Sequence, residues 1–417
     1  MSYTPHLPST LNACIKLPAS KSLSNRALLL CALSGTQSVV RNQSVCDDTR
    51  VMRQGLEAPR QAKVDIGAAG TAMRFLTAYF AATPGTDHLL TGTERMRQRP
   101  IGVLVDALRS LGADIEYAEN EGFPPLRIHG RTLQGGTLRL PAHISSQYIS
   151  ALLMVAPLME EGLTLQLEGD IISRPYIDMT LQLMQHFGAS AGWTDERTLH
   201  TAPGRYTDGT LFTVESDWSA ASYWYELVAL SPDPNARIAL PHLTAQSLQG
   251  DSAVRHYFEA LGVHTVFDDT LPGAVLTRTA RRPDVTDGMF NLDLTATPDL
   301  AQTLVVTCAL LRQPFRFTGL QSLRIKETDR MAALQNELRR LGFDLMIEGD
   351  DTLTIEHYTD AMPPTAAPSI ATYHDHRMAM AFAPAALFYQ ALTIENPEVV
   401  IKSYPDFWKN LQSLFHS

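Results

Sequence analysis

The 417-residue sequence has few cysteines, little charge and no long apolar run. The four cysteines lie far apart, with no CxxC pair and no metal-ligand spacing. They therefore predict buried thiols in a reducing compartment, at Cys14, Cys31, Cys46 and Cys308. No stretch of about 18 apolar residues is present, which excludes a membrane-spanning helix. The N-terminal MSYTPHLPST lacks the basic start and apolar core of a signal peptide. These absences predict a cytoplasmic protein.

A surplus of positive charge is also absent. Lysine and arginine number 34 against 44 aspartate and glutamate residues, a formal net charge of −10. This balance excludes nucleic acid and anionic membranes as the main partners. The length predicts two or three domains. An acidic protein that binds anions must gather its few cations in one place.

One helix ending recurs along the chain. Apolar residues at helical spacing are followed by glycine, and then by an alternating pattern typical of a strand, at Gly112, Gly188, Gly262 and Gly342. Their regular separation predicts a repeated αβ unit of roughly 70 to 80 residues. A chance recurrence of glycine-ended helices is the alternative.

Four apolar helices are predicted to begin with a small or short polar residue. They cover residues 18–33, 70–82, 145–158 and 375–388, and three of the four have a cation in the first turns. Such residues can be simple N-caps. Helix N-termini also offer free N–H groups to an anion, so four together favour a highly charged anionic ligand. The cations are Lys21, Arg26, Arg74 and Arg377.

The segment SLRIKETDR, residues 322–330, mixes three cations with two carboxylates. A surface network of ion pairs is the ordinary interpretation of such a run. The alternative is a site where cations hold an anion while a carboxylate moves a proton.

Other motifs are weaker on their own. LPASKS lacks the GxxxxGK[ST] phosphate loop, and residues 374–376 are too close together to converge on a metal ion. Arg99 and its neighbours Arg95 and Arg97 precede a helix that is predicted to have Pro100 in its first turn. Asp299 precedes an apolar helix, where an N-cap is the simpler role.

Taken together, the motifs resemble the 5-enolpyruvylshikimate-3-phosphate synthase family. They occur in order from about Leu17 to Trp408, nearly the whole chain. They are LPASKSLSNRALLLCAL, GTAMRFL, RMRQRPIGVLVDALRSLGA, SSQYISALLMVAPL, SRPYIDMTLQLM, RIKETDRMAAL, DHRMAMAF and KSYPDFW.

The resemblance implies an α/β, inverse β/α barrel-like fold of two domains. Each domain has three βαβαββ units whose helix N-termini face the cleft. The expected domains are 18–216, on the shikimate 3-phosphate side, and 1–17 with 217–417, with hinges near 17 and 216. A monomer without a metal or cofactor is expected.

The resemblance also implies a reaction. The enolpyruvyl group of phosphoenolpyruvate would pass to the 5-hydroxyl of shikimate 3-phosphate, with release of phosphate. Asp299 would be the base on the hydroxyl and Glu327 the acid toward the methylene carbon, with Lys21 as a third catalytic residue. The expected phosphoenolpyruvate ligands are Lys21, Gly70, Arg99, Gln147, Arg330, Arg377 and Lys402. The expected shikimate 3-phosphate ligands are Lys21, Ser22, Arg26, Ser145, Ser146, Gln147, Ser173, Tyr176, Asp299, Ser322 and Lys326.

The sequence departs from the family at several positions. Ala68 replaces a usual asparagine, Phe75 a proline and Ser322 an asparagine, and Ala19 stands where glycine is common. The segment between Arg50 and Ala68 is too short for the family's extra helix and strands, which predicts an abbreviated first unit. Glyphosate sensitivity is expected, since Gly70 leaves space for that inhibitor.

Two other functions remain open at this point. The related enolpyruvyl transferase that acts on a UDP-amino sugar relies on a cysteine in a glycine-rich loop, and no cysteine here has that setting. A non-catalytic anion-binding paralogue should have lost costly charged residues, yet the matched cations and carboxylates are present.

Overall fold

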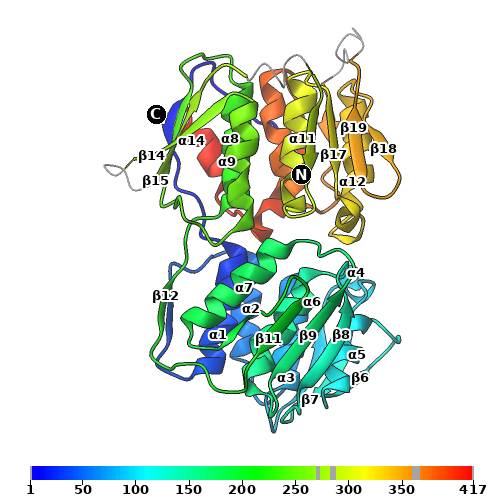
Figure 1. Ribbon diagram of the computed structural model, residues 1–417. Helices are drawn as coiled ribbons and strands as arrows, with labels where there is room; N and C mark the ends of the chain where they lie inside the picture. The colour runs from blue at the N-terminus through cyan, green and yellow to red at the C-terminus, as the bar shows by residue number, and fades with distance from the viewer. Residues whose placement is uncertain (1, 269–272, 282–287, 359–366, 416–417) are drawn as a thin grey trace. The chain divides into compact units, whose positions relative to one another are not determined.

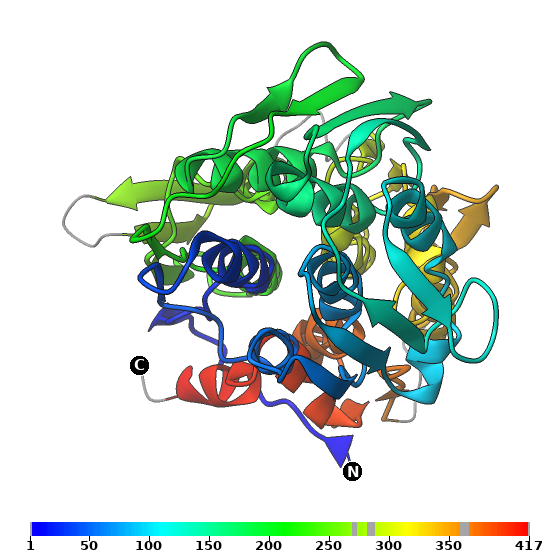
Figure 2. The same cartoon turned by 90° about the horizontal axis from the view of Figure 1, so that it is seen from below.

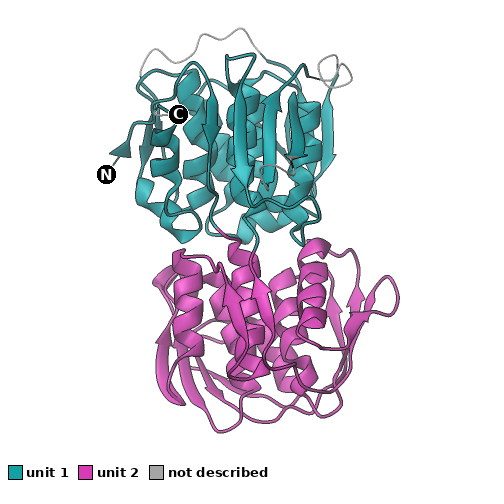
Figure 3. Ribbon diagram, turned by 90° about the vertical axis from the view of Figure 1, so that its left-hand side faces the viewer, with its two compact units in different colours: residues 1–18, 215–417 teal, residues 19–214 magenta. Residues whose placement is uncertain are grey.

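The computed structural model describes residues 2–268, 273–281, 288–358 and 367–415. The chain divides into two compact units (Figure 3). Unit 1 contains Met1–Pro18 and Glu215–Ser417, and unit 2 contains Ala19–Val214. None of the helices within the described ranges combines the length and apolar character that a membrane crossing needs.

Unit 2 begins with an abbreviated αβ element. Strand β3 (Val39–Arg41) pairs in parallel with β12 (Leu211–Thr213), and this sheet has two strands among the described residues. The helices α1 (Lys21–Ser34) and α2 (Asp47–Leu56) flank β3 in the sequence. After α2 the chain passes directly into β4 (Gln61–Asp65), so the expected shortening of the first unit is confirmed.

Two complete βαβαββ units follow. The first forms a sheet of order β4-β5-β7-β6 and the second a sheet of order β8-β9-β11-β10, each with one parallel and two antiparallel pairings. Helix α1, which precedes these two βαβαββ units in unit 2, is seen nearly end-on in dark blue in Figure 2. The elements are α3 (Gly70–Ala81), β5 (Asp87–Thr91), α4 (Glu94–Arg97), α5 (Gly102–Ser110), β6 (Asp114–Tyr117), β7 (Leu126–His129), β8 (Gly136–Pro141), α6 (Ser146–Val155), η1 (Ala156–Leu158), β9 (Leu163–Glu168), α7 (Arg174–His186), β10 (Ala191–Trp193) and β11 (Thr198–Thr201).

Unit 1 repeats this pattern with strands from both ends of the chain. Its sheets have the orders β2-β13-β15-β14, β16-β17-β19-β18 and β1-β21-β20 in the described residues. Its strands are β1 (Ser2–Tyr3), β2 (Asn12–Cys14), β13 (Arg237–Pro241), β14 (Val263–Asp268), β15 (Gly273–Arg278), β16 (Phe290–Asp293), β17 (Phe315–Thr318), β18 (Met346–Glu348), β19 (Thr352–Ile355), β20 (Ser369–Ile370) and β21 (Thr393–Glu395). Its helices are α8 (Trp218–Leu230), η2 (Gly250–Ala253), α9 (Val254–Ala260), η3 (Pro298–Leu300), α11 (Ala301–Leu310), η4 (Gln321–Ile325), α12 (Arg330–Arg340), α13 (His376–Phe382), η5 (Ala383–Leu387), η6 (Pro397–Lys402) and α14 (Phe407–Ser413).

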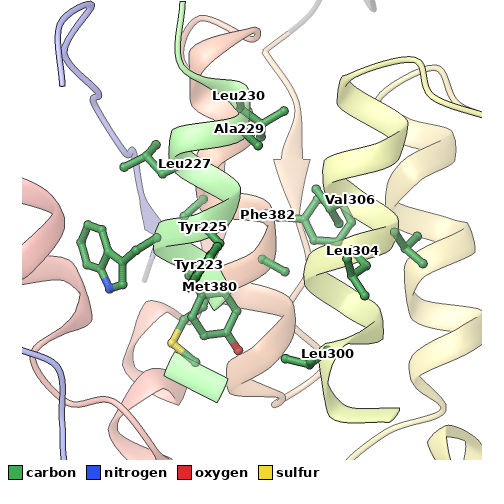
Figure 4. Close-up of a cluster of buried hydrophobic side chains, with 14 of the residues drawn as sticks. Tyr223, Tyr225, Leu227, Ala229, Leu230, Leu300, Leu304, Val306, Met380 and Phe382 are labelled. Carbon is green, nitrogen blue, oxygen red and sulfur yellow. The ribbon is translucent and has the colours of Figure 1, made fainter. Parts of the chain in front are cut away.

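The most apolar helices form the centre of each unit. Every residue of α11 and of α13 is buried, which includes the polar side chains of Gln302, His376 and Arg377 beside the apolar ones. Figure 4 shows side chains of α8, α11 and α13 meeting in the unit 1 core, with Tyr223, Leu304 and Phe382 among them. The strands lie on the outside (Figure 1), and several alternate between buried and more exposed positions, as in β7 and β9. The expected inverse arrangement of helices and sheets is confirmed.

The predicted helix endings are confirmed by the backbone. The helices α5, α7, α9 and α12 each end two residues before a glycine with φ between 87° and 100°. Only glycine adopts this left-handed conformation without strain, so it stops the helix and turns the chain toward the next strand. These glycines are Gly112, Gly188, Gly262 and Gly342.

Three local predictions are wrong. Pro100 does not lie in the first turn of α5, which begins at Gly102 after Ile101, while Arg95 and Arg97 form the separate short helix α4. Of the four cysteines predicted to be buried, Cys14 is exposed, because it lies at an outward position of the short strand β2, and Cys31 is half-buried. Asp299 is not an N-cap, because its carboxylate accepts hydrogen bonds from two arginine side chains.

Candidate functional site

In unit 2 the expected anion ligands gather at the starts of α1, α3, α6 and α7. Ser20 caps α1, where its hydroxyl accepts from the Leu23 N–H, and Ser145 caps α6 by accepting from the Gln147 N–H. The Gln147 side chain donates to the Thr71 hydroxyl at 3.2 Å and so joins α6 to α3. These contacts bring helix N-termini with their free N–H groups into one region of the unit.

Arg26 is the most buried cation of this region, at 1% exposure. Its Nε donates to the Thr180 hydroxyl at 2.7 Å and its Nη2 to the Ser150 hydroxyl at 3.2 Å. The remaining donors reach the carbonyl oxygens of Ser22 and Tyr176. Burial lowers the pKa of Arg26 to about 10, so the group remains charged at neutral pH. Its hydrogen-bond partners within the described chain are all neutral, and a buried cation in such surroundings favours an anionic ligand.

Phe75 supports Arg26 through its ring. The Arg26 guanidinium carbon lies 5.3 Å from the centre of the Phe75 ring and 6.0 Å from that of Tyr176. Such cation–π contacts orient the guanidinium and offset part of its desolvation. The unusual phenylalanine therefore contacts Arg26, and through it the region that is expected to bind shikimate 3-phosphate.

Arg74 organises the neighbouring part of unit 2. It is 5% exposed, and its Nη1 donates to the Gly70 carbonyl oxygen at 3.1 Å while its Nη2 reaches the Pro100 carbonyl oxygen at 3.5 Å. The Tyr148 hydroxyl donates to the same Pro100 oxygen at 2.6 Å. The start of α3 is thereby fixed against the Arg99–Pro100 turn. Arg99 lies close to Gly70, since a Cβ built on that glycine would stand 2.7 Å from Arg99 Nη1.

Lys21 begins α1 and has a carboxylate partner that the motifs did not reveal. Its Nζ lies 3.1 Å from Asp48 Oδ2, and the side chains are 16% and 5% exposed. Asp48 belongs to the first turn of α2. Ser173 is 8% exposed and has φ 58°, a left-handed conformation that starts α7. Ser22 and Ser146 are half-buried in the first turns of α1 and α6.

In unit 1 the expected residues form one network, which we call the unit 1 ion cluster. Arg330 lies at its centre and is 2% exposed. Its Nη1 lies 3.0 Å from Asp299 Oδ1 and its Nη2 lies 2.8 Å from Glu327 Oε2. The members are Asp299, Lys326, Glu327, Arg330, Asp375, Arg377 and Lys402.

The two predicted catalytic carboxylates each have more than one cationic partner. Asp299 lies 3.0 Å from Arg377 Nη2 and 3.5 Å from Lys326 Nζ, in addition to its contact with Arg330. Burial alone would raise the pKa of Asp299, but Arg377, Lys326 and Arg330 outweigh it and hold the pKa well below its ordinary value. Glu327 accepts from Lys402 Nζ at 2.7 Å as well as from Arg330.

Asp375 is the member of the cluster that sequence reasoning did not assign. It is 0% exposed and accepts from Arg330 Nε at 2.6 Å and Nη2 at 3.3 Å, a bidentate geometry. The same carboxylate caps α13 by accepting from the Arg377 N–H at 2.9 Å. The sequence signal for this residue was an aspartate directly before an apolar helix. An aspartate that caps such a helix can also accept hydrogen bonds from a buried arginine.

The charged residues of the segment 322–330 therefore divide into members of the ion cluster and residues with structural contacts. Lys326, Glu327 and Arg330 belong to the ion cluster. Asp329 instead caps α12, and Arg324 donates to carbonyl oxygens at Gly349 and Asp350. The Ser322 hydroxyl is buried and has no hydrogen-bond partner in the described part of the chain.

Comparisons with known proteins agree with this arrangement. The family model of EPSP synthase (3-phosphoshikimate 1-carboxyvinyltransferase) matches residues 5–60 and 53–411. A 3-phosphoshikimate 1-carboxyvinyltransferase from Bacteroides fragilis is 54% identical over 412 residues, covering 99% of this chain and 97% of the relative. Another from Photobacterium profundum is 36% identical over 434 residues, covering 97% of each chain.

A solved structure supports the fold. The EPSP synthase from Acinetobacter baumannii superimposes with a TM-score of 0.74 at 22% identity, covering 99% of this chain and 97% of that structure. The family match and both relatives extend over nearly the whole sequence. The chain belongs to the EPSP synthase (3-phosphoshikimate 1-carboxyvinyltransferase) family.

Proposed function

We propose that this chain transfers the enolpyruvyl group of phosphoenolpyruvate to the 5-hydroxyl of shikimate 3-phosphate and releases phosphate. The observation that carries the proposal is the unit 1 ion cluster, in which two partly exposed carboxylates share four cations with one fully buried carboxylate. The relatives are named for the same reaction. A reaction between two anions needs such cations, because their repulsion must be offset before the reacting atoms approach.

We assign the unit 2 cations to the substrate anions. Arg26, with its neutral hydrogen-bond partners, would hold shikimate 3-phosphate together with Ser22, Ser145, Ser146 and Ser173. Tyr176 would pack beside the shikimate ring, and Gln147 would contact both substrates. Arg99 and Lys21 would hold phosphoenolpyruvate, and Gly70 would give its phosphate close access to the backbone.

We assign the unit 1 cations mainly to phosphoenolpyruvate. Arg330, Arg377 and Lys402 would hold this substrate, while Lys326 and, through its unpartnered hydroxyl, Ser322 would hold shikimate 3-phosphate. Phosphoenolpyruvate competes with Asp299 and Glu327 for the same cations. When a cation turns from Asp299 to the substrate, the pKa of Asp299 rises toward its ordinary range. Substrate binding would therefore turn Asp299 into a group that can accept a proton.

The proposed chemistry has two steps that balance. In the first, the 5-hydroxyl oxygen bonds to C2 of phosphoenolpyruvate, Asp299 accepts the hydroxyl proton, and Glu327 gives a proton to the methylene carbon. This step forms a tetrahedral intermediate with a new methyl group. In the second, Glu327, now a carboxylate, takes a proton back from the methyl group, the C2–O bond breaks with its electrons leaving on phosphate, and the C–H electrons restore the double bond. Two carboxylates in different surroundings suit these opposite proton transfers.

The test is phosphate release by the purified chain, with each substrate omitted in turn. We expect release only when both substrates are present. Glu327→Gln and Asp299→Asn should keep substrate binding and lower turnover by about 10²–10⁴-fold, the usual worth of a positioned acid or base. Asp350→Asn is the matched control, since that carboxylate lies in the same unit and its side chain is 95% exposed. Near-normal turnover in either cluster variant would refute its assigned role.

A further inference from the structure

Glu337 is a buried carboxylate that the proposed reaction does not use. It lies on α12 seven residues after Arg330, which places both side chains on one face of the helix. It is 0% exposed. A carboxylate is rarely buried to this extent unless its oxygens are satisfied.

Its hydrogen bonds all reach the segment that leads into α13. Glu337 Oε2 accepts from the Ala371 N–H at 3.1 Å, and Oε1 accepts from the Tyr373 hydroxyl at 2.7 Å. Arg340 Nε, on an exposed side chain, lies 3.6 Å from Oε2. Glu337 thus joins α12 to residues 371–373.

This segment has an unusual backbone. Tyr373 has φ 53° and His374 has φ 56°, so two consecutive non-glycine residues are left-handed. Such conformations persist only where surrounding contacts impose them. The next residue is Asp375, which holds Arg330 and caps the N–H of Arg377.

The segment is therefore fixed to α12 at two points. Upstream, Glu337 holds Ala371 and Tyr373, and downstream, Arg330 holds Asp375. The left-handed pair lies between these points. Loss of the upstream contact would leave Asp375 attached to Arg330 but would release the backbone that sets where α13 begins.

We propose that Glu337 is a positioning residue, which through Ala371 and Tyr373 sets the placement of Asp375 and Arg377 toward phosphoenolpyruvate. This inference rests on the proposed function. It predicts a selective defect: variants at this point should weaken the use of phosphoenolpyruvate more than that of shikimate 3-phosphate, whose proposed ligand Arg26 lies in unit 2 and should be unaffected.

The first test measures KM for each substrate in a graded series. Tyr373→Phe removes the hydroxyl that donates to Glu337 and that also contacts Asn336, and it should raise KM for phosphoenolpyruvate about three- to thirtyfold, with KM for shikimate 3-phosphate within about twofold of wild type. Glu337→Ala removes the hydrogen bonds to both Ala371 and Tyr373 and should raise KM for phosphoenolpyruvate further. Glu337→Gln should rescue, because its amide oxygen can accept from Ala371 and its amide nitrogen can donate to Tyr373.

The matched control is Gln335→Met on the same helix. Gln335 Nε2 donates to the Leu345 carbonyl oxygen at 2.8 Å, so it ties α12 to a segment that does not lead to Arg377. We expect this variant to keep both KM values. Equal effects on the two substrates, or a Gln335→Met defect as large as that of Tyr373→Phe, would show general loosening of α12 and overturn the proposal.

The second test does not depend on activity. Hydrogen exchange at the Ala371 amide should accelerate in Glu337→Ala and Tyr373→Phe, and remain slow in Glu337→Gln and Gln335→Met. If the wild-type chain lacks transferase activity, the proposed function fails while exchange still reports the contact. If Glu337→Ala does not fold, Tyr373→Phe decides the question. Unchanged KM for phosphoenolpyruvate together with accelerated exchange would refute the positioning role.

Discussion

Gly70 offers the sharpest single perturbation of the candidate site. An alanine methyl group there would stand 2.7 Å from Arg99 Nη1 and 3.2 Å from Arg74 Nη1. The first distance is too short for any stable contact, so the Arg99 guanidinium must move. Arg74 has less freedom, because it is buried and donates to the Gly70 and Pro100 carbonyl oxygens. The displacement therefore falls on Arg99.

The magnitude follows from what Arg99 is proposed to hold. A charge-assisted hydrogen bond contributes about 1.5–3 kcal/mol, and its loss corresponds to about a 10- to 150-fold change in an equilibrium constant. We expect Gly70→Ala to raise KM for phosphoenolpyruvate within that range. KM for shikimate 3-phosphate should change by less than about threefold, since the side-chain hydrogen bonds of Arg26 are made to Thr180 of α7 and Ser150 of α6 and not to α3. The fold should persist, because alanine is a better helix former than glycine.

The assay is steady-state phosphate release with phosphoenolpyruvate varied at saturating shikimate 3-phosphate. Gly102→Ala is the matched control, since Gly102 also begins a helix and its nearest Cβ contact is an ordinary 3.5 Å. This control should keep the wild-type KM. An unchanged KM in Gly70→Ala, with an intact thermal transition, would refute the proposed role of Arg99.

Three further predictions concern other parts of the chain. Glyphosate should inhibit competitively with phosphoenolpyruvate, and a full rate at millimolar inhibitor would contradict the expected sensitivity. Phe75→Leu should raise KM for shikimate 3-phosphate about two- to thirtyfold by removing the ring that contacts Arg26, and a rise confined to phosphoenolpyruvate would disprove that link. Burial, with Asp299 nearby, raises the pKa of Asp251 to about 6. Because this lies above the unfolded value of about 4, stability is lost as pH rises from about 4 through 6, at a cost of about 3 kcal/mol by pH 7. Asp251→Asn should remove that loss, and thermal transitions from pH 4 to 7 that keep the wild-type slope would contradict this.

The repeated αβ unit was predictable from the sequence because its signals are local. A helix that ends at Gly112 or Gly342 needs only a glycine with positive φ and apolar residues at helical spacing. The shortened first unit followed from the family resemblance, since the residues between Arg50 and Ala68 are too few for the family's extra helix and strands. The βαβαββ order of elements in each unit and the division into two domains, by contrast, came from the family resemblance, since periodicity does not determine which strands pair.

The candidate site was predictable only where residues lie within motifs. Lys326, Glu327 and Arg330 are close in sequence, and the ion cluster contains all three. Asp48 and Glu337 have no motif, since each meets its partner only through folding, 27 residues away at Lys21 and 34 at Ala371. A carboxylate on a helix gives no sequence signal that distinguishes such a partner from a solvated side chain.

Asp299 shows why the simpler interpretation failed. As an N-cap it would accept one or two backbone N–H groups of its own helix, a contact that its position after Pro298 favours. In the folded chain Arg330 and Arg377 approach it from segments 31 and 78 residues away. Charge-assisted hydrogen bonds are roughly twice as strong as neutral ones, so the Asp299 carboxylate accepts from the two arginines instead of from backbone N–H groups. The same competition would recur when phosphoenolpyruvate binds, because the substrate's anionic groups can take these arginines in turn and leave Asp299 able to accept a proton.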